Sequence, residues 1–396
     1  MKSRILAVTL MSAVFTVGVM IEFPPPTLAQ TFGVLYEFTG GADGGNPYAS
    51  TLVQDLVGNL YGTTEYGGNL TCTGGLSPGC GTVFKLDSGS ETVLHSFAGS
   101  PDGAFPLPGL MQDRAGNLYG TTFEGGTGSS SNGTIFKVTA TGNDVVLYSF
   151  AGSPDGGSPF SVLIRDSIGN IYGTTRSGGA FGFGSVFKLN KSGKESVLYS
   201  FTGGPDGATP FAGLILDPAG NLYGTTYAGG ASSGHGVVFK LDTSGTETVL
   251  HTFTASTDGA NPYAGLTRDS QGNLYGTTYF GGKSGFGTIF KIDTTGRETV
   301  LHSFAGPEGA NPYFGSLVID ENGNLFGTAS TGGASNLGTV FHFNSVLRKL
   351  KVLHTFSGTD GANPLGGLLD GADGKLYGTT YQGGTFGAGV TFALGP

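Results

Sequence analysis

The sequence contains no tryptophan and few charged residues. Charged side chains make up 12% of its 396 residues, and 19 Lys and Arg stand against 28 Asp and Glu. Nucleic-acid binding requires a basic surface, and electrostatic docking on anionic lipid requires a basic cluster. The composition therefore argues against both kinds of partner.

The N-terminus has the pattern of a secretory signal peptide. Lys2 and Arg4 give a positive start, an almost wholly apolar run follows over residues 5–21, and Ala29 provides a small residue for cleavage. We therefore expect a signal peptide over residues 1–30 and a mature protein that is secreted, periplasmic or held at the cell surface. The alternative is a retained membrane anchor, because the apolar run is long enough for one.

Cysteine is scarce. Cys72 and Cys80, the two in the chain, lie in one Gly-rich insert. In an exported chain this spacing predicts a disulfide that closes the insert. A metal site is the rival interpretation, but no His lies nearby and two ligands are too few.

The dominant positive feature is a repeat of about fifty residues. Glycine is abundant, at 75 residues, but follows no strict collagen period. Three motifs each occur seven times: Asn-Leu-Tyr-Gly-Thr-Thr, Gly-Thr-Val-Phe-Lys-Leu and Val-Leu-His-Ser-Phe. The aromatic residue of the first motif falls at Tyr61, Tyr119, Tyr172, Tyr223, Tyr275, Phe326 and Tyr377. A fixed period of this length indicates a solenoid, a propeller or an array.

Each repeat contains four strand-like segments separated by turn residues. In the second repeat they fall at residues 109–113, 117–122, 134–138 and 145–150. Outside the signal peptide no segment has helical periodicity. We therefore predict an all-β fold: one domain over residues 31–396, built as a seven-bladed β-propeller with four antiparallel strands per blade. An open β-solenoid of seven coils is the alternative.

The phase of the repeat predicts how the ring closes. The mature chain begins with a fourth strand, at residues 34–38, and ends with a third strand, at residues 390–394. The N-terminal strand should therefore complete the last blade, which removes two open sheet edges.

Most polar residues recur at equivalent positions, which favours a structural role. His95, His251, His302 and His354 share one position with three tyrosines. Acidic residues recur in the connections between repeats, at Asp43, Asp102, Asp155, Asp206, Asp258, Glu308 and Asp360. We interpret these as turn-capping residues. A cation collar, or a structural calcium ion, is the alternative, although calcium-loop spacing is lacking. No other cofactor is expected.

The loops between the second and third strands hold the least repetitive residues. Aromatic side chains there suit sugar stacking or peptide capture, and they equally suit packing between blades. The candidate ligand-binding residues, which include Arg165 outside these loops, are Glu65, Tyr66, Glu124, Arg165, Arg176, Tyr227, His235, Tyr279 and Tyr381. The expected ligand is extracellular, either a glycan or a protein, and we expect the protein to be a monomer.

An enzymatic role is the alternative, a lyase or lactonase acting on extracellular carbohydrate or lactone. It would require Glu65, Glu124, Arg165, Arg176 and His235 to converge at the central channel. No nucleophile elbow, zinc-protease or phosphate-loop motif is present in a matching context.

The three motifs and the intervening Gly-Gly pairs together resemble the GloVer tandem repeat of bacterial proteins. The resemblance covers about residues 33–394. It implies export and often a C-terminal sorting signal, which we do not find in this sequence. It supplies no established activity, so it implies no catalytic residues. The expected role is accordingly a binding or scaffold module.

Overall fold

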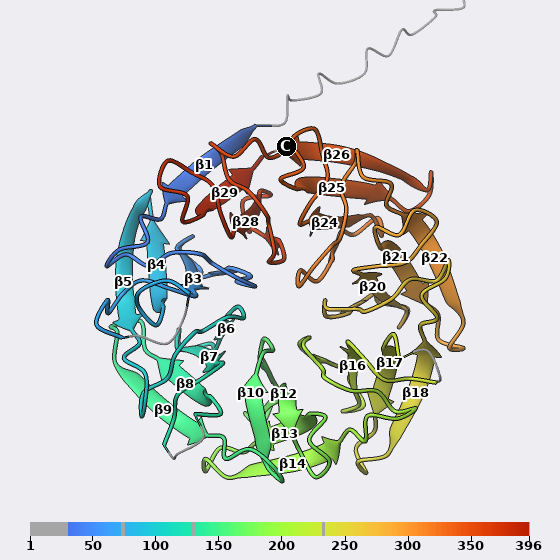
Figure 1. The fold of residues 1–396 in the computed structure, drawn as a ribbon, viewed down its shortest axis with the longest axis horizontal. Coiled ribbons are helices and arrows are strands. Elements are labelled where there is room, and N and C mark those ends of the chain that lie inside the picture. The colour runs from blue at the N-terminus through green and yellow to red at the C-terminus, as the bar shows by residue number, and fades with distance from the viewer. Residues whose placement is uncertain (1–30, 73–75, 128–130, 232–233, 396) are drawn as a thin grey trace, which may run out of the picture.

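The computed structural model is a ring of seven β-sheets, and it describes residues 31–72, 76–127, 131–231 and 234–395 (Figure 1). Within these residues every regular element is a strand. The expected signal peptide lies outside them. No helix in the described part of the chain is long and apolar enough to cross a membrane.

The strands group into seven antiparallel blades, numbered here in chain order. Their bounds are, for blade 1, β2 (Val53–Gln54), β3 (Leu60–Thr64), β4 (Thr82–Asp87), β5 (Ser90–Ser96); blade 2, β6 (Met111–Gln112), β7 (Leu118–Thr122), β8 (Thr134–Val138), β9 (Asp144–Ser149); blade 3, β10 (Gly156–Pro159), β11 (Ile164–Arg165), β12 (Ile171–Gly178), β13 (Ser185–Leu189), β14 (Glu195–Ser200); blade 4, β15 (Ile215–Leu216), β16 (Leu222–Thr226), β17 (Val237–Leu241), β18 (Glu247–Thr252); blade 5, β19 (Thr267–Arg268), β20 (Leu274–Thr278), β21 (Thr288–Ile292), β22 (Glu298–Ser303); blade 6, β23 (Val318–Ile319), β24 (Leu325–Ala329), β25 (Thr339–Asn344), β26 (Lys349–Thr355); and blade 7, β27 (Leu369–Asp370), β28 (Leu376–Thr380), β29 (Val390–Leu394), β1 (Phe32–Glu37).

The prediction of a seven-bladed propeller with four principal strands per blade is confirmed. Blade 3 carries one additional strand, β10. The predicted closure is also confirmed, because β1 pairs antiparallel with β29 and so completes blade 7. The open solenoid is excluded by this pairing.

Aromatic rings pack edge-to-face at every interface between blades. A Phe that follows the fourth strand of one blade meets a Phe in the third strand of the next, for example Phe97 against Phe136 at a centroid distance of 5.0 Å. The same contact closes the ring, where Phe38 meets Phe84 at 5.0 Å. Both rings of each pair are almost completely buried. Edge-to-face pairs add to the large area that such rings bury, so the repeated Phe positions hold the blades together.

The glycine of the second strand is required by this packing. A Cβ added at Gly62 would lie 2.6 Å from the Phe84 ring, and one at Gly120 would lie 2.5 Å from the Phe136 ring. The Tyr-Gly-Thr-Thr motif therefore leaves room for the aromatic ring of the neighbouring strand.

The ring has two different faces. We call the side with the tight turns between first and second strands the turn face. We call the opposite side, which carries the loops between second and third strands and the connections between blades, the loop face. Several connections on the ring extend toward its axis (Figure 1).

Candidate ligand-binding site

The recurrent Asp residues of the turn face build turns. Asp55 accepts backbone hydrogen bonds from Val57 and Asn59 at 3.0 and 2.9 Å, and the Tyr61 hydroxyl donates to it at 3.0 Å. These hydrogen bonds lower the pKa of the Asp55 carboxyl against the opposing effect of burial. The same arrangement recurs at Asp113, Asp166, Asp217 and Asp269.

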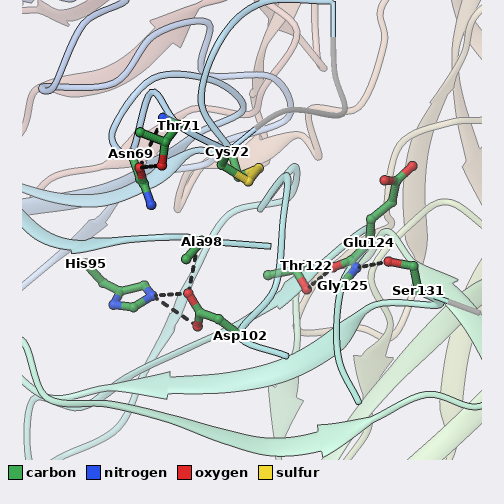
Figure 2. Close-up of a disulfide and its surroundings, with 11 residues drawn as sticks. Asn69, Thr71, Cys72, His95, Ala98, Asp102, Thr122, Glu124, Gly125 and Ser131 are labelled. Atoms are coloured by element: carbon green, nitrogen blue, oxygen red, sulfur yellow. Dashed lines mark hydrogen bonds and ion pairs between the residues drawn. A yellow bond between two sulfur atoms is a disulfide. The ribbon is translucent and has the colours of Figure 1, made fainter. Parts of the chain in front are cut away.

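The recurrent acids between blades cap the end of the fourth strand. Asp102 accepts a hydrogen bond from the Ala98 N–H at 3.0 Å and faces His95 Nε2 at 3.1 Å (Figure 2). At equivalent positions Tyr148 and Tyr199 donate their hydroxyl protons to Asp155 and Asp206, both at 3.0 Å.

One member of this series brings three candidate metal ligands together. His95, Asp102 and Asp144 place ligand atoms within 4.8 Å of one another. A nitrogen and two carboxylates differ from the all-oxygen shell that calcium prefers. Tyrosine replaces histidine at the same position in other blades, so the arrangement fits blade packing without a metal.

The loop face carries a cluster of aromatic rings at the ring axis, which we call the aromatic floor. Its members are Tyr48, Phe160, Phe211, Tyr263, Tyr313 and Phe314. Phe314 is the central ring, with centroid distances of 4.8 Å to Phe160, 5.2 Å to Tyr263 and 5.5 Å to Tyr48. These rings come from connections that enter blades 1, 3, 4, 5 and 6, so the floor spans the axis.

Most floor residues follow the repeated proline in the connections between blades. Phe314 is different, because the equivalent residues in other blades include Ala49, Ala212 and Ala264. All members except Phe160 are half-buried, so the floor presents aromatic surface to solvent.

A cavity of about 220 Å³ lies in the channel against the floor. Phe160, Phe211, Tyr263 and Phe314 form part of its lining, and the remainder is mostly apolar residues of the innermost strands. The floor thus separates this cavity from the loop face.

The residue that follows Thr-Thr in each blade forms a rim around the floor. Tyr227 packs against Tyr263 at 4.6 Å, Tyr279 against Tyr313 at 5.0 Å, and Tyr381 against Tyr48 at 5.3 Å. These three predicted site residues therefore extend the aromatic floor, and each is half-buried.

Arg176 occupies the same rim position in blade 3 and is exposed. Its guanidinium lies 5.7 Å from the Phe123 ring and 5.5 Å from the Phe211 ring. It therefore places a positive charge beside the floor through cation–π contacts.

A second pocket lies between blades 1 and 2. It measures about 260 Å³, and its main lining residues are Glu65, Tyr66, Leu76, Phe105, Phe123 and Glu124. Leu76 belongs to the insert that is closed by the Cys72–Cys80 disulfide, which confirms the predicted cysteine pairing. Three of the predicted site residues, Glu65, Tyr66 and Glu124, thus share one pocket.

Glu65 has unusual surroundings for a carboxylate. Burial raises the pKa of its carboxyl to about 7, and the Tyr66 and Tyr381 side chains oppose the shift by hydrogen bonding. Its Oε2 atom is buried and has no hydrogen-bond partner within the described chain.

Two predicted site residues lie elsewhere. Arg165 is on β11, where its Nη1 atom lies 3.6 Å from the Asp113 carboxylate at the turn face. His235 lies in the loop between β16 and β17, where its carbonyl accepts a hydrogen bond from Asn261. The five residues named for an enzyme therefore do not converge at the channel.

Sequence reasoning did not identify the floor or Phe105. Aromatic residues that follow proline in most connections were a signal for the floor, and Phe314 was visible as a departure from the repeat. Phe105 was visible in the same way, because the six equivalent residues are Asn, Ser or Thr.

Fold and site together define a seven-bladed β-propeller with an aromatic surface over its channel. The model of the Gloeobacter/Verrucomicrobia repeat matches residues 69–270 and 232–396. The chain belongs to this family. No curated protein sequence matches the chain.

Solved structures share the fold at low sequence identity. The extracellular domain of a hybrid two component system from B. thetaiotaomicron is 14% identical at a TM-score of 0.59, over 92% of this chain. Oligogalacturonate lyase from Vibrio parahaemolyticus is 11% identical at 0.55, covering 93% of this chain and 97% of the lyase. PorZ, a surface component of the type-IX secretion system of Porphyromonas gingivalis, is 18% identical at 0.54, over 88% of this chain.

The chain spans 39% of the two component system structure and 46% of PorZ. At these identities the likeness concerns the fold. The disulfide is in keeping with an extracellular or periplasmic protein.

Proposed function

We propose that the protein is an exported binding module that captures carbohydrate on its loop face. The observation that carries this proposal is the aromatic floor, with half-buried rings from several blades gathered at the axis. Flat aromatic surfaces with polar tips suit the apolar faces and hydroxyl groups of sugars. The proposal includes export through residues 1–30 as a cleaved signal peptide, and a monomeric mature protein.

The tyrosines of the floor keep their hydroxyl protons. Burial raises the pKa of Tyr48 to about 12 and raises the pKa of Tyr313 and Tyr263 as well. At neutral pH these hydroxyls remain donors as well as acceptors, which is the mixed hydrogen-bonding capacity that sugar hydroxyls require.

The test is a glycan array followed by titration of the best neutral oligosaccharide. We expect Tyr227→Ala and Tyr279→Ala each to weaken binding about 5- to 30-fold, because each removes one stacking surface. Leu56→Ala is the matched control, because Leu56 is fully exposed in a turn on the opposite face. An array without neutral-glycan binding by folded protein, or equal loss in the control, would refute the proposal.

A further inference from the structure

Several residues that line the pocket between blades 1 and 2 differ from the residues at equivalent positions in the other blades. At the rim position, Glu65 stands where blades 4, 5 and 7 have tyrosine. The disulfide-closed insert is in the same loop and supplies Leu76. Phe105 faces them from the connection that enters blade 2, and its ring packs against Tyr66 at 5.8 Å.

Phe105 occupies a backbone conformation that disfavours it. Its φ is 59°, and the equivalent residues in the other blades also have positive φ. Asn tolerates this left-handed region, whereas a bulky side chain there is strained. At four of these positions Asn also donates to the carbonyl of the preceding rim residue, as Asn46 does to Tyr381 at 2.9 Å. Phe105 lacks a side-chain donor, so this hydrogen bond is not formed in blade 2. The Phe105 ring instead lines the pocket.

Two carboxylates without an ion-pair partner line the pocket, and the nearest cation that contacts a lining ring is Arg176, 5.7 Å from Phe123. Glu65 and Glu124 both line the pocket, and no described Lys, Arg or His forms an ion pair with either carboxylate. In Figure 2 the Glu124 carboxylate points away from the Thr122 hydroxyl, which donates to the Glu124 carbonyl, and from Ser131, which accepts the Gly125 N–H. The unpartnered Oε2 of Glu65 adds a buried acceptor.

We propose that this pocket binds an organic cation, an alkylammonium group held between the Tyr66, Phe105 and Phe123 rings and the two carboxylates. Aromatic faces attract such cations, and quaternary ammonium groups are bound by cages of this composition. The volume of about 260 Å³ lies below the range of drug-sized sites, so it suits one group of a larger ligand. The inference rests on the proposed binding role of the loop face. It adds that the part of the ligand held in this pocket is positively charged.

The pH dependence follows from the groups that face Glu65. Tyr48, Tyr66 and Tyr381 surround it, with Glu124 across the pocket, and the three tyrosines stay neutral because their pKa values are raised. A permanent cation binds the ionised form of Glu65. Affinity should therefore be full above the Glu65 pKa of about 7 and fall as pH drops below it.

The experiment titrates the purified protein with choline and with 3,3-dimethylbutan-1-ol, its uncharged analogue of the same shape. We expect choline to bind at least about tenfold more tightly than the neutral alcohol. Glu65→Gln and Phe105→Asn should each reduce choline affinity about tenfold, whereas Glu321→Gln, an exposed carboxylate on the turn face, should leave it unchanged. Wild-type affinity should rise from about pH 5.5 to about pH 8.5 and stay flat in Glu65→Gln.

Phe105→Asn also controls for a loss of choline affinity that is caused by unfolding. It restores the residue found in other blades and relieves the strained φ, so its Tm should equal or exceed that of the wild type. Equal affinity for choline and the alcohol, no choline binding, or undiminished choline binding by Glu65→Gln would overturn the inference. If neutral glycans bind and choline does not, the proposed function stands and this pocket fails. If choline alone binds, the cation pocket stands and the carbohydrate proposal fails.

Discussion

At several interfaces between blades, a buried glutamate carboxyl faces the carboxylate of an aspartate. Glu195 of β14 faces Asp155, which already accepts the Tyr148 hydroxyl proton. Glu195 Oε1 and Asp155 Oδ1 are both buried without a hydrogen-bond partner within the described residues. Burial, and then the Asp155 charge, raises the pKa of the Glu195 carboxyl from 4.5 to about 7. Glu91 and Glu247 stand in equivalent pairs with Asp43 and Asp206.

Such a pair makes stability depend on pH in a definite direction. The folded pKa lies above the unfolded one, so the folded protein binds more protons than the unfolded chain between about pH 4.5 and 7. Stability associated with Glu195 is therefore greatest below about pH 4.5 and is lost as pH rises through 7. Tyr148 takes the place of histidine beside Asp155. A change of stability with pH at this interface can therefore be attributed to the carboxyl pair without a contribution from histidine.

Replacement of Glu195 by Gln should remove this dependence. We expect Glu195→Gln to raise Tm by roughly 1–2 °C at pH 8 and to leave it nearly unchanged at pH 5, because glutamine resembles the protonated acid. Differential scanning calorimetry of wild type, Glu195→Gln and the exposed control Glu321→Gln measures both. A Tm shift of the same size at the two pH values would contradict the assignment.

At the scale of the element, β1 is the strand on which ring closure depends. It covers the open edge of β29 from Phe32 to Glu37. Phe32 stacks on the His354 ring at 3.6 Å, and Phe38, just beyond the strand, is fully buried against Phe84. One short strand thus seals the sheet edge of blade 7 and both of its interfaces.

Deletion of residues 31–40 should therefore destabilise the whole ring. The truncated chain loses the buried Phe38 ring and the half-buried Phe32 ring, and it exposes a sheet edge that favours aggregation. We expect Tm to fall by about 10 °C or more, or the protein to aggregate, compared with a chain that lacks residues 1–30 alone. Thermal unfolding followed by circular dichroism decides this, and equal melting of the two chains would show that β1 is dispensable.

For the whole molecule, the sequence predicted the architecture better than the site. The Tyr-Gly-Thr-Thr and Val-Phe-Lys-Leu motifs each occur seven times, and each predicts both a strand and the number of blades. The chain begins with a fourth strand and ends with a third strand, which predicts how the ring closes. The floor could not be derived in this way, because Tyr48 and Phe314 are 266 positions apart and meet through the curvature of the ring. Arg165 and His235 break the repeat but lie away from the site, so irregularity alone does not identify a binding residue.

The pairing of β1 with β29 has a consequence for chain connectivity. Gly395 donates its N–H to the Thr31 carbonyl at 2.8 Å, so the two ends of the propeller already touch. A circular permutant could join them with a copy of the exposed turn between β17 and β18 and open the chain at Ser244. Its new N-terminal strand would be β18, which would then close blade 4 as β1 now closes blade 7. We expect this permutant to fold with a similar Tm, which calorimetry can measure; failure to fold would show that the blades, though alike in shape, are not interchangeable as the point of closure.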